Sequence, residues 1–152
     1  MAITARPAAT AACKRAIQDA CRETGQVVPK TKGELIRCAY ESLALQYRQA
    51  LGWLEELTGE RIKVIHIVGG GSQNDLLNQF TADACQRPVL AGPVEATSIG
   101  NLVMQLFALG EIRSLAEGRA LVRRSVEPKA FDPQNTGVWD EAYARFQKIL
   151  SR

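Results

Sequence analysis

The sequence is poor in the residues that build metal sites and disulfide frameworks. Its 152 residues include one histidine, His66, and four cysteines, Cys13, Cys21, Cys38 and Cys85. No two cysteines form a CxxC pair or another metal-ligand spacing, so a zinc site is not expected. A disulfide between Cys21 and Cys38 is sterically feasible across two neighbouring helices. Reduced thiols are nevertheless our prediction, because the cytoplasm keeps cysteines reduced.

The chain also lacks the signals of membrane, exported and nucleic-acid-binding proteins. No stretch approaches the ~20 apolar residues of a membrane helix. Lys14 and Arg15 interrupt the segment in which a signal peptide would need its apolar core. The net charge is +3, and no basic block is longer than Arg123-Arg124, which does not favour nucleic-acid binding. We therefore expect a cytoplasmic protein without nucleic-acid or membrane partners.

The composition is that of a soluble globular protein, with 46% apolar and 23% charged residues. Residues 1–14 are expected to form a poorly ordered tail before a domain over residues 15–152, although helical periodicity already begins at Thr10. Apolar spacing and turn residues predict helices over residues 10–23, 32–57, 73–85, 97–109, 115–124 and 138–150. In the second of these, three- and four-residue steps predict one buried stripe, made of Leu35, Ile36, Ala39, Leu43, Tyr47, Leu51 and Leu54.

Only two segments have the character of strands, residues 63–68 and residues 87–91. A helix separates them, which predicts a parallel pair with a right-handed crossover. The Pro-containing segment 128–137 is expected to be irregular. Two strands are too few for an independent sheet. We therefore expect an α/β fold of which this chain supplies one end, with the other strands lying elsewhere.

The most informative segment is VIHIVGGGSQN, residues 64–74, in which a β-prone run meets three glycines and then a helix. Glycine lets a ligand lie against bare backbone, and a helix start presents free N–H groups to it. A Walker A loop is excluded because no lysine follows at the required place. A dinucleotide fingerprint is disfavoured because Asn74 stands where the third glycine belongs. A plain structural turn remains the alternative.

The longer segment HIVGGGSQNDLLNQFTADACQRPVLAGPVEATSIGN resembles the carbohydrate kinases of the FGGY family, and the similarity extends over about residues 15–130. Within that family it is most similar to the members that act on L-rhamnulose. The resemblance implies the C-terminal part of an actin-like ATPase (ribonuclease H-like) domain, helix-rich with a short parallel pair of strands. It also implies phosphorylation of L-rhamnulose at the 1-hydroxyl with ATP and Mg²⁺.

The resemblance assigns the glycine turn to the adenosine of ATP. Gly70 is the expected closest contact, Gly69 and Gly71 shape the turn, and the Asn74 amide meets the purine edge or ribose. A helix-start residue that satisfies local backbone is the alternative role for Asn74. No residue of this chain is expected to be catalytic or to bind Mg²⁺. In the family the general base and the phosphate loops precede the matched region, and the sugar site belongs mainly to the first domain.

Three functions stay open at this stage. The first is the ATP-binding portion of a sugar kinase for L-rhamnulose, with xylulose or fuculose as the alternative sugar. The second is a truncated, non-catalytic protein whose exposed strand edge and apolar helix faces bind a partner. The third is a free-standing Rossmann-like nucleotide binder.

Overall fold

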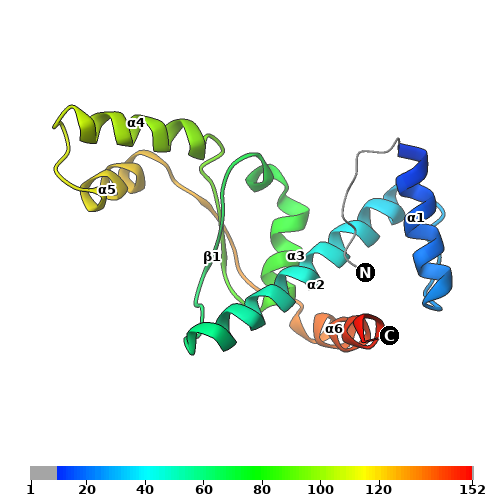
Figure 1. Ribbon diagram of the computed structural model, residues 1–152. Helices are drawn as coiled ribbons and strands as arrows, with labels where there is room; N and C mark the ends of the chain where they lie inside the picture. Colours follow the sequence, from blue (N-terminus) through cyan, green and yellow to red (C-terminus); the bar gives the residue numbers. More distant parts are fainter. Residues whose placement is uncertain (1–9, 152) are drawn as a thin grey trace.

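A computed structural model describes residues 10–151 of the chain. Six helices, a short 3-10 helix and three short strands form an elongated arrangement (Figure 1). In chain order the elements are α1 (Thr10–Glu23), α2 (Lys32–Thr58), β1 (Ile65–Ile67), the 3-10 helix η1 (Gly70–Gln73), α3 (Asp75–Cys85), β2 (Val89–Ala91), α4 (Ala96–Ala108), α5 (Leu115–Ser125), β3 (Lys129–Phe131) and α6 (Thr136–Leu150). The six predicted helices are confirmed, with ends that differ by one or two residues.

The division into a poorly ordered tail over residues 1–14 and a domain over residues 15–152 stays a prediction. Residues 10–14 lie in α1. The rest of the expected tail falls on residues 1–9, outside the described residues. Among residues 10–151, no helix combines the length and the apolar character that crossing a bilayer requires.

Helix α2 is fixed at both ends by the residues that flank it. The Thr31 hydroxyl accepts a hydrogen bond from the Glu34 N–H, and the Glu34 carboxylate accepts one from the Thr31 N–H, 2.9 Å away. This reciprocal arrangement satisfies two of the N–H groups that a helix start leaves free. Gly59 ends the helix in the left-handed conformation, at φ 69°, which glycine adopts without steric cost.

The sheet has the order β1-β2-β3 and mixes two pairing directions. β1 and β2 are parallel, with Ile65 opposite Val89, which confirms the predicted pair. β2 and β3 are antiparallel, with Val89 opposite Phe131. The prediction of an irregular segment over residues 128–137 was therefore wrong for Lys129–Phe131. Three residues between prolines carry no strand periodicity, and β3 forms because β2 offers it a second edge.

The core consists of two small clusters on either side of α3. One joins Ala44 and Leu45 of α2 to Ala84 and Trp139, and the other joins Ala82 of α3 to Val89, Ala91 and Phe131 of the sheet. Small residues on opposite faces of α3 allow both α2 and the sheet to approach it closely. The Trp139 ring packs against Phe80 of α3, with ring centroids 5.2 Å apart, and so anchors α6.

Helix α2 carries two apolar faces rather than the single buried stripe that its sequence predicts. Its buried residues are Ala44, Leu45 and Leu51. Of the seven residues in the predicted stripe, only Leu51 is buried, so this prediction was wrong. A second face of the helix bears a solvent-exposed row of apolar residues separated by three, four or seven positions, which we call the outer stripe. Its exposed members are Ile36, Leu43, Tyr47, Leu54 and Leu57.

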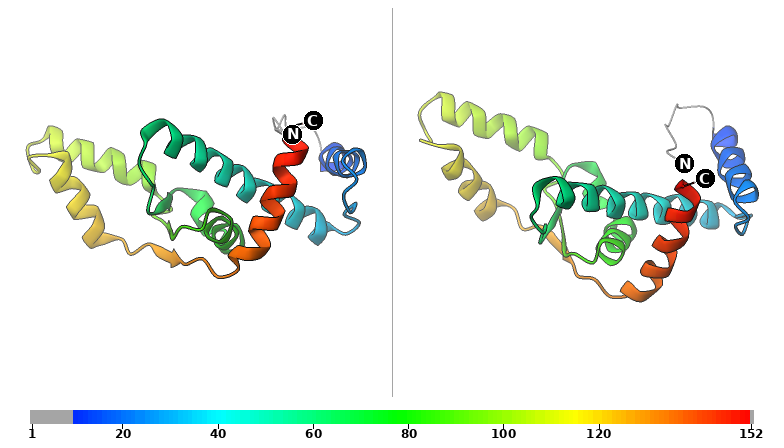
Figure 2. Two further views of the ribbon diagram at one scale, coloured as in Figure 1. Left: turned by 90° about the horizontal axis from the view of Figure 1, so that it is seen from below. Right: turned by 60° about the horizontal axis from the view of Figure 1, so that its bottom comes forward.

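Helices α4 and α5 form an arm that leaves the sheet at the end of the molecule opposite α1 (Figures 1 and 2). The two helices are packed tightly at Gly118. A Cβ added there would lie 2.6 Å from a Val103 methyl and 3.1 Å from the end of Ile112. No residue of α4 is buried, and Leu102, Met104 and Phe107 are exposed. The arm therefore presents an apolar surface that nothing in the described part of the chain covers.

Candidate functional site: the glycine turn

The glycine turn lies at the carboxyl end of the parallel strand pair. β1 ends at Ile67, whose carbonyl accepts a hydrogen bond from the Gly92 N–H beyond β2, at 2.8 Å. The Gly69 N–H in turn donates to the Pro93 carbonyl, at 2.9 Å. These two bonds hold the segments after β1 and β2 side by side. Ligands of α/β proteins bind at this end of parallel strands.

Gly69 makes the bend that turns the chain away from the strand. Its φ is 77° and its ψ is −164°, a combination that is essentially restricted to glycine. Its carbonyl accepts two hydrogen bonds from Ser72, from the N–H at 3.0 Å and from the hydroxyl at 2.6 Å. Gly69 therefore shapes the turn, as its sequence position predicts, and any larger residue would be strained there.

Gly70 and Gly71 open the 3-10 helix η1 and face solvent. A Cβ added to either residue would meet no heavy atom within 4 Å, so bare backbone borders open space at this point. The first N–H groups of a helix have no partner inside it. The two glycines thus offer a flat surface with hydrogen-bond donors. This arrangement can accept a planar or anionic ligand.

Asn74 stands between η1 and α3 and has one identified role. Its side-chain oxygen accepts a hydrogen bond from the Leu77 N–H, at 3.1 Å, and so caps α3. The structure thus contains the helix-start interaction that was the alternative to ligand binding. Capping uses Oδ1, so Nδ2 is the group that a ligand would meet. Contact with adenosine at Asn74, as at Gly69, Gly70 and Gly71, stays a prediction.

Asn78, one turn into α3, is a polar residue to which sequence analysis assigned no role. It is fully buried, and its Nδ2 donates to the Ser72 carbonyl at 2.9 Å. The side chain thus reaches out of its own helix to the backbone of the glycine turn. Local sequence rules do not reveal this contact, because it joins residues in two different elements.

A partly exposed ion pair holds the segment that leads into β1. The Arg87 guanidinium donates to the Ile62 carbonyl at 2.7 Å and to the Glu55 carboxylate at 3.1 Å. The same Glu55 oxygen accepts the Ile62 N–H at 2.9 Å. Loss of solvation acts to raise the pKa of Glu55, but the Ile62 N–H and the Arg87 charge outweigh it and hold the pKa below the ordinary value of 4.5. The carboxylate therefore links α2, the start of β1 and the start of β2.

This lowered pKa predicts an acid-sensitive contribution to stability. A carboxyl whose pKa is lower in the folded chain stabilises it above the ordinary pKa and ceases to do so as the pH falls through the lowered value. We expect Glu55→Gln to lower, at pH 7, the temperature at which half of the helical circular dichroism signal is lost. The deficit against the unchanged chain should shrink as the pH falls below about 4.5. Circular dichroism melts of both chains between pH 3 and 7 measure this deficit. The control is Glu56→Gln, which changes the exposed neighbouring residue. A deficit that is constant with pH would contradict the assignment.

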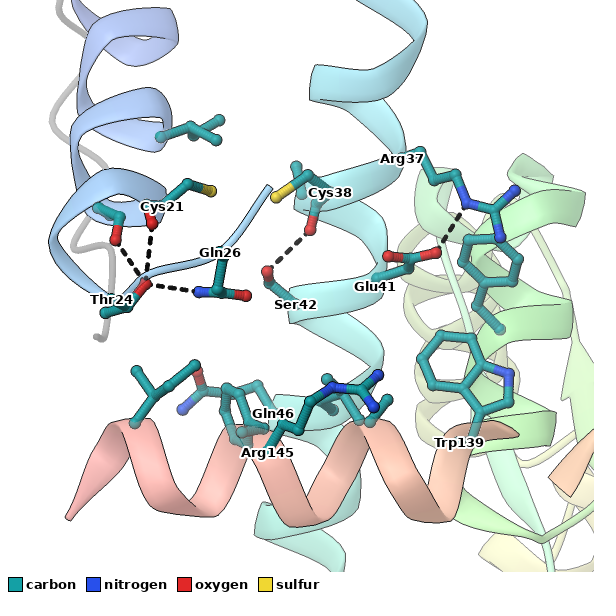
Figure 3. Close-up of a pocket in the computed structure, with 18 of the residues that line it drawn as sticks. Cys21, Thr24, Gln26, Arg37, Cys38, Glu41, Ser42, Gln46, Trp139 and Arg145 are labelled. Carbon is teal, nitrogen blue, oxygen red and sulfur yellow. Dashed lines mark hydrogen bonds and ion pairs between the residues drawn. The ribbon is translucent and has the colours of Figure 1, made fainter. Parts of the chain in front are cut away.

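A separate cavity of about 540 Å³ lies between α1, α2 and α6 (Figure 3). Its walls include Cys21 and Cys38, which point toward each other, as well as Trp139 and Arg145. All four cysteines are free thiols. Burial and the neighbouring Cys21 raise the pKa of Cys38 to about 11, so its thiol is protonated at neutral pH and is a poor nucleophile. The cavity includes none of the predicted site residues.

His66 and Asp83 are two further residues with side chains capable of acid–base chemistry, and neither lies in the glycine turn. His66 is exposed on β1, opposite in direction to Ile65 and Ile67, as alternation predicts. Asp83 is buried and accepts hydrogen bonds from the Gln79 side chain and the Gln134 N–H. Over residues 10–151, no three His, Cys, Asp or Glu side chains gather as metal ligands do.

Comparison with known proteins gives one consistent family. The sequence model described as "FGGY family of carbohydrate kinases, C-terminal domain" matches residues 4–109. The rhamnulokinase of Bacteroides thetaiotaomicron is 49% identical over 137 residues, which are 90% of this chain and 28% of that protein. The rhamnulokinase of Pectobacterium atrosepticum is 47% identical over 135 residues, 89% of this chain and 27% of the relative. The rhamnulokinase of Bacillus subtilis is 47% identical over 119 residues, which are 78% of this chain and 24% of that protein.

The fold comparison agrees with the sequence comparison. A crystal structure of xylulose kinase from Rhodospirillum rubrum superposes with a TM-score of 0.63 at 23% identity, and covers 84% of this chain and 26% of that one. The fold is therefore that of the C-terminal part of an actin-like ATPase domain, as the resemblance implied. This excludes the Rossmann-like alternative. The chain spans about a quarter of the length of the curated relatives it matches.

Proposed function

This chain belongs to the FGGY family of carbohydrate kinases, and on that premise we propose that it is the ATP-binding C-terminal portion of a kinase that converts L-rhamnulose to L-rhamnulose 1-phosphate. The choice of sugar is supported by the rhamnulokinases that are 45–49% identical to this chain over the aligned residues. ATP supplies the transferred phosphoryl group. The part of this chain in the reaction is to bind and orient the nucleotide.

The open face of the glycine turn carries this proposal. Gly70 and Gly71 leave space where side chains would otherwise stand, so the adenosine rests on their backbone. The Nδ2 of Asn74 and the free N–H groups of η1 donate to ring or ribose acceptors. These contacts fix the nucleotide without touching the reacting atoms, and they contribute positioning rather than proton transfer.

The remaining parts of the reaction belong to the portion of the kinase that precedes this one. Phosphoryl transfer needs a base for the sugar hydroxyl and groups that hold Mg²⁺ and the β- and γ-phosphates. We assign the Mg²⁺ ligands to the preceding portion, as the resemblance to the FGGY family implies. The sugar site is assigned there as well.

A domain exchange tests the proposal. The chain takes the place of the matching C-terminal segment of Bacteroides thetaiotaomicron rhamnulokinase, to which it is 49% identical, and ATP-dependent phosphorylation of L-rhamnulose is assayed by ADP release. We expect turnover by this chimera. The 152-residue chain alone should give none above background, because it lacks the base and the phosphate loops.

The control is the Bacteroides enzyme without its C-terminal segment, which should also be inactive. Turnover by the 152-residue chain alone, with contaminating kinase excluded, would refute its role as a portion of a larger enzyme. A folded chimera without turnover would refute its role as the nucleotide-binding portion. The sugar is tested separately, by assaying the chain together with its own upstream coding sequence on L-rhamnulose, xylulose and fuculose.

A second candidate function rests on the apolar surfaces. The outer stripe of α2 and the exposed residues of α4 would let a non-catalytic remnant bind a partner protein. The partner of matching chemistry is the N-terminal portion of such a kinase, supplied as a separate polypeptide. An upstream in-frame kinase sequence favours the first function, whereas its absence favours the remnant.

A further inference from the structure

The buried side chain of Asn78 connects α3 to the back of the glycine turn, on the side away from solvent. We propose that Asn78 is a positioning residue that holds Gly70 and Gly71 in the conformation that binds the nucleotide. The inference rests on the proposed nucleotide role of the turn. Asn78 touches no ligand itself and acts through Ser72.

The hydrogen bond from Asn78 has a defined direction. Its exposure is 0% and that of Ser72 is 7%, so the contact is shielded from water. The Ser72 carbonyl can only accept, so the amide must present Nδ2 and not Oδ1. Oδ1 has no hydrogen-bond partner in the described part of the chain. The side chain therefore makes one polar contact, and that contact is with the turn.

Ser72 passes this restraint to the glycines. Its N–H and hydroxyl both donate to the Gly69 carbonyl, and Gly69 donates to Pro93 beyond β2. Gly70 and Gly71 lie between these two fixed points and have no side chain with which to pack. Their conformation is consequently set by Ser72 and Gly69 together with the Asn74 N–H, which donates to the Gly71 carbonyl at 3.2 Å. Asn78 is the side chain that holds Ser72 to α3.

A neighbour on the same helix provides a matched comparison. Thr81 is as deeply buried as Asn78, with 1% exposure. Its hydroxyl donates to the Leu77 carbonyl of its own helix, at 2.7 Å. Thr81 thus has an ordinary intrahelical contact and no link to the turn. A buried polar residue of α3 that serves stability alone should behave like Thr81.

Hydrogen–deuterium exchange of the full chain separates the two roles. In Asn78→Ala the hydrogen-bonded amides of Ser72 and Asn74 should exchange roughly fivefold faster, the effect of losing one neutral hydrogen bond. In Thr81→Ala they should exchange at the unchanged rate. If Asn78→Ala does not fold, Asn78→Thr serves in its place, since its side chain fills part of the volume but cannot reach Ser72. Equal exchange of the turn in the Asn78 and Thr81 variants would overturn the inference.

Kinetics of the chimera give the readout that a purely structural role would leave unchanged. Asn78→Ala should raise the KM for ATP roughly fivefold and leave kcat and the KM for the sugar unaltered. Simple destabilisation would instead lower the active fraction, and with it kcat. Addition of ADP to the unchanged chain should slow exchange at residues 70–74. Absence of that protection would contradict the nucleotide site itself, while the exchange difference between the Asn78 and Thr81 variants would still report on positioning.

Discussion

A Gly70→Val exchange is expected to raise the KM for ATP of the chimera at least roughly tenfold, which corresponds to about 1.4 kcal/mol of binding free energy. The branched side chain would occupy the space in which the adenosine rests. The KM for L-rhamnulose should change little, because we assign the sugar site to the preceding portion of the kinase. A raised KM for ATP with an unchanged KM for the sugar indicates that the substitution removed ground-state contacts with the nucleotide alone.

The backbone geometry of Gly70 separates an effect on the ligand from an effect on the fold. Positive φ occurs at Gly69 and not at Gly70, and a Cβ at Gly70 has free space around it. A side chain at Gly70 therefore meets the ligand rather than the protein. Gly69→Ala is the contrasting variant, because it strains the backbone and should disturb the fold as well.

Two controls accompany the Gly70→Val measurement. Gly70→Ala adds a single methyl group and should have a smaller effect on the KM for ATP than valine. Circular dichroism should show an unchanged helix content for both Gly70 variants. A correctly folded Gly70→Val enzyme with unaltered ATP dependence would mean that the three glycines form only a structural turn.

The second large effect concerns the isolated 152-residue chain, which should associate and unfold without a sharp transition. Its outer stripe exposes Leu57 at 83% and Leu54 at 51%, and the arm exposes Leu109 at 77%. Contiguous apolar surface of this kind drives self-association. Size-exclusion chromatography with light scattering should give species larger than the monomer, together with a shallow thermal transition.

Polar substitutions on the outer stripe test the cause. Ile36→Gln, Leu43→Gln and Leu54→Gln together should shift the chain toward a monomer while its helix content stays the same, because these side chains lie outside the core. The same number of exchanges at exposed polar positions, Lys32→Gln, Glu56→Gln and Arg119→Gln, should leave association unchanged. A clean monomer with a two-state transition from the unmodified chain would contradict the expectation.

The helices and the parallel pair were predictable because local signals define them. The Thr31–Glu34 capping box and Gly59 delimit α2 within its own sequence. Strand β3 was not predictable, since three residues between prolines form a strand only where β2 already provides an edge. The buried face of α2 was misassigned because both of its faces are apolar, and sequence periodicity cannot tell which face meets α3.

In the candidate site, too, the features defined by local sequence were predictable and those that depend on tertiary contacts were not. The glycine turn is a contiguous motif, so its position and the capping role open to Asn74 could be derived from sequence. The restraint on Ser72 could not, because it depends on the buried environment that α3 and the sheet create around Asn78. A lone asparagine in a helix gives no sign of a contact outside that helix.

The composition of the core also dictates when it can form during synthesis. Ala44 and Leu45 of α2 have their largest core partner, Trp139, in the last helix of the chain. At ~5–20 residues per second, translation reaches that helix on the order of ten seconds after α2 has been made. Helix α3 is made early in this interval and covers part of the buried face of α2, whereas the surface that receives Trp139 stays uncovered until α6 has been made. The outer stripe stays exposed throughout. The growing polypeptide therefore carries an amphipathic target for holding chaperones, and this core cluster is complete only when α6 has been made.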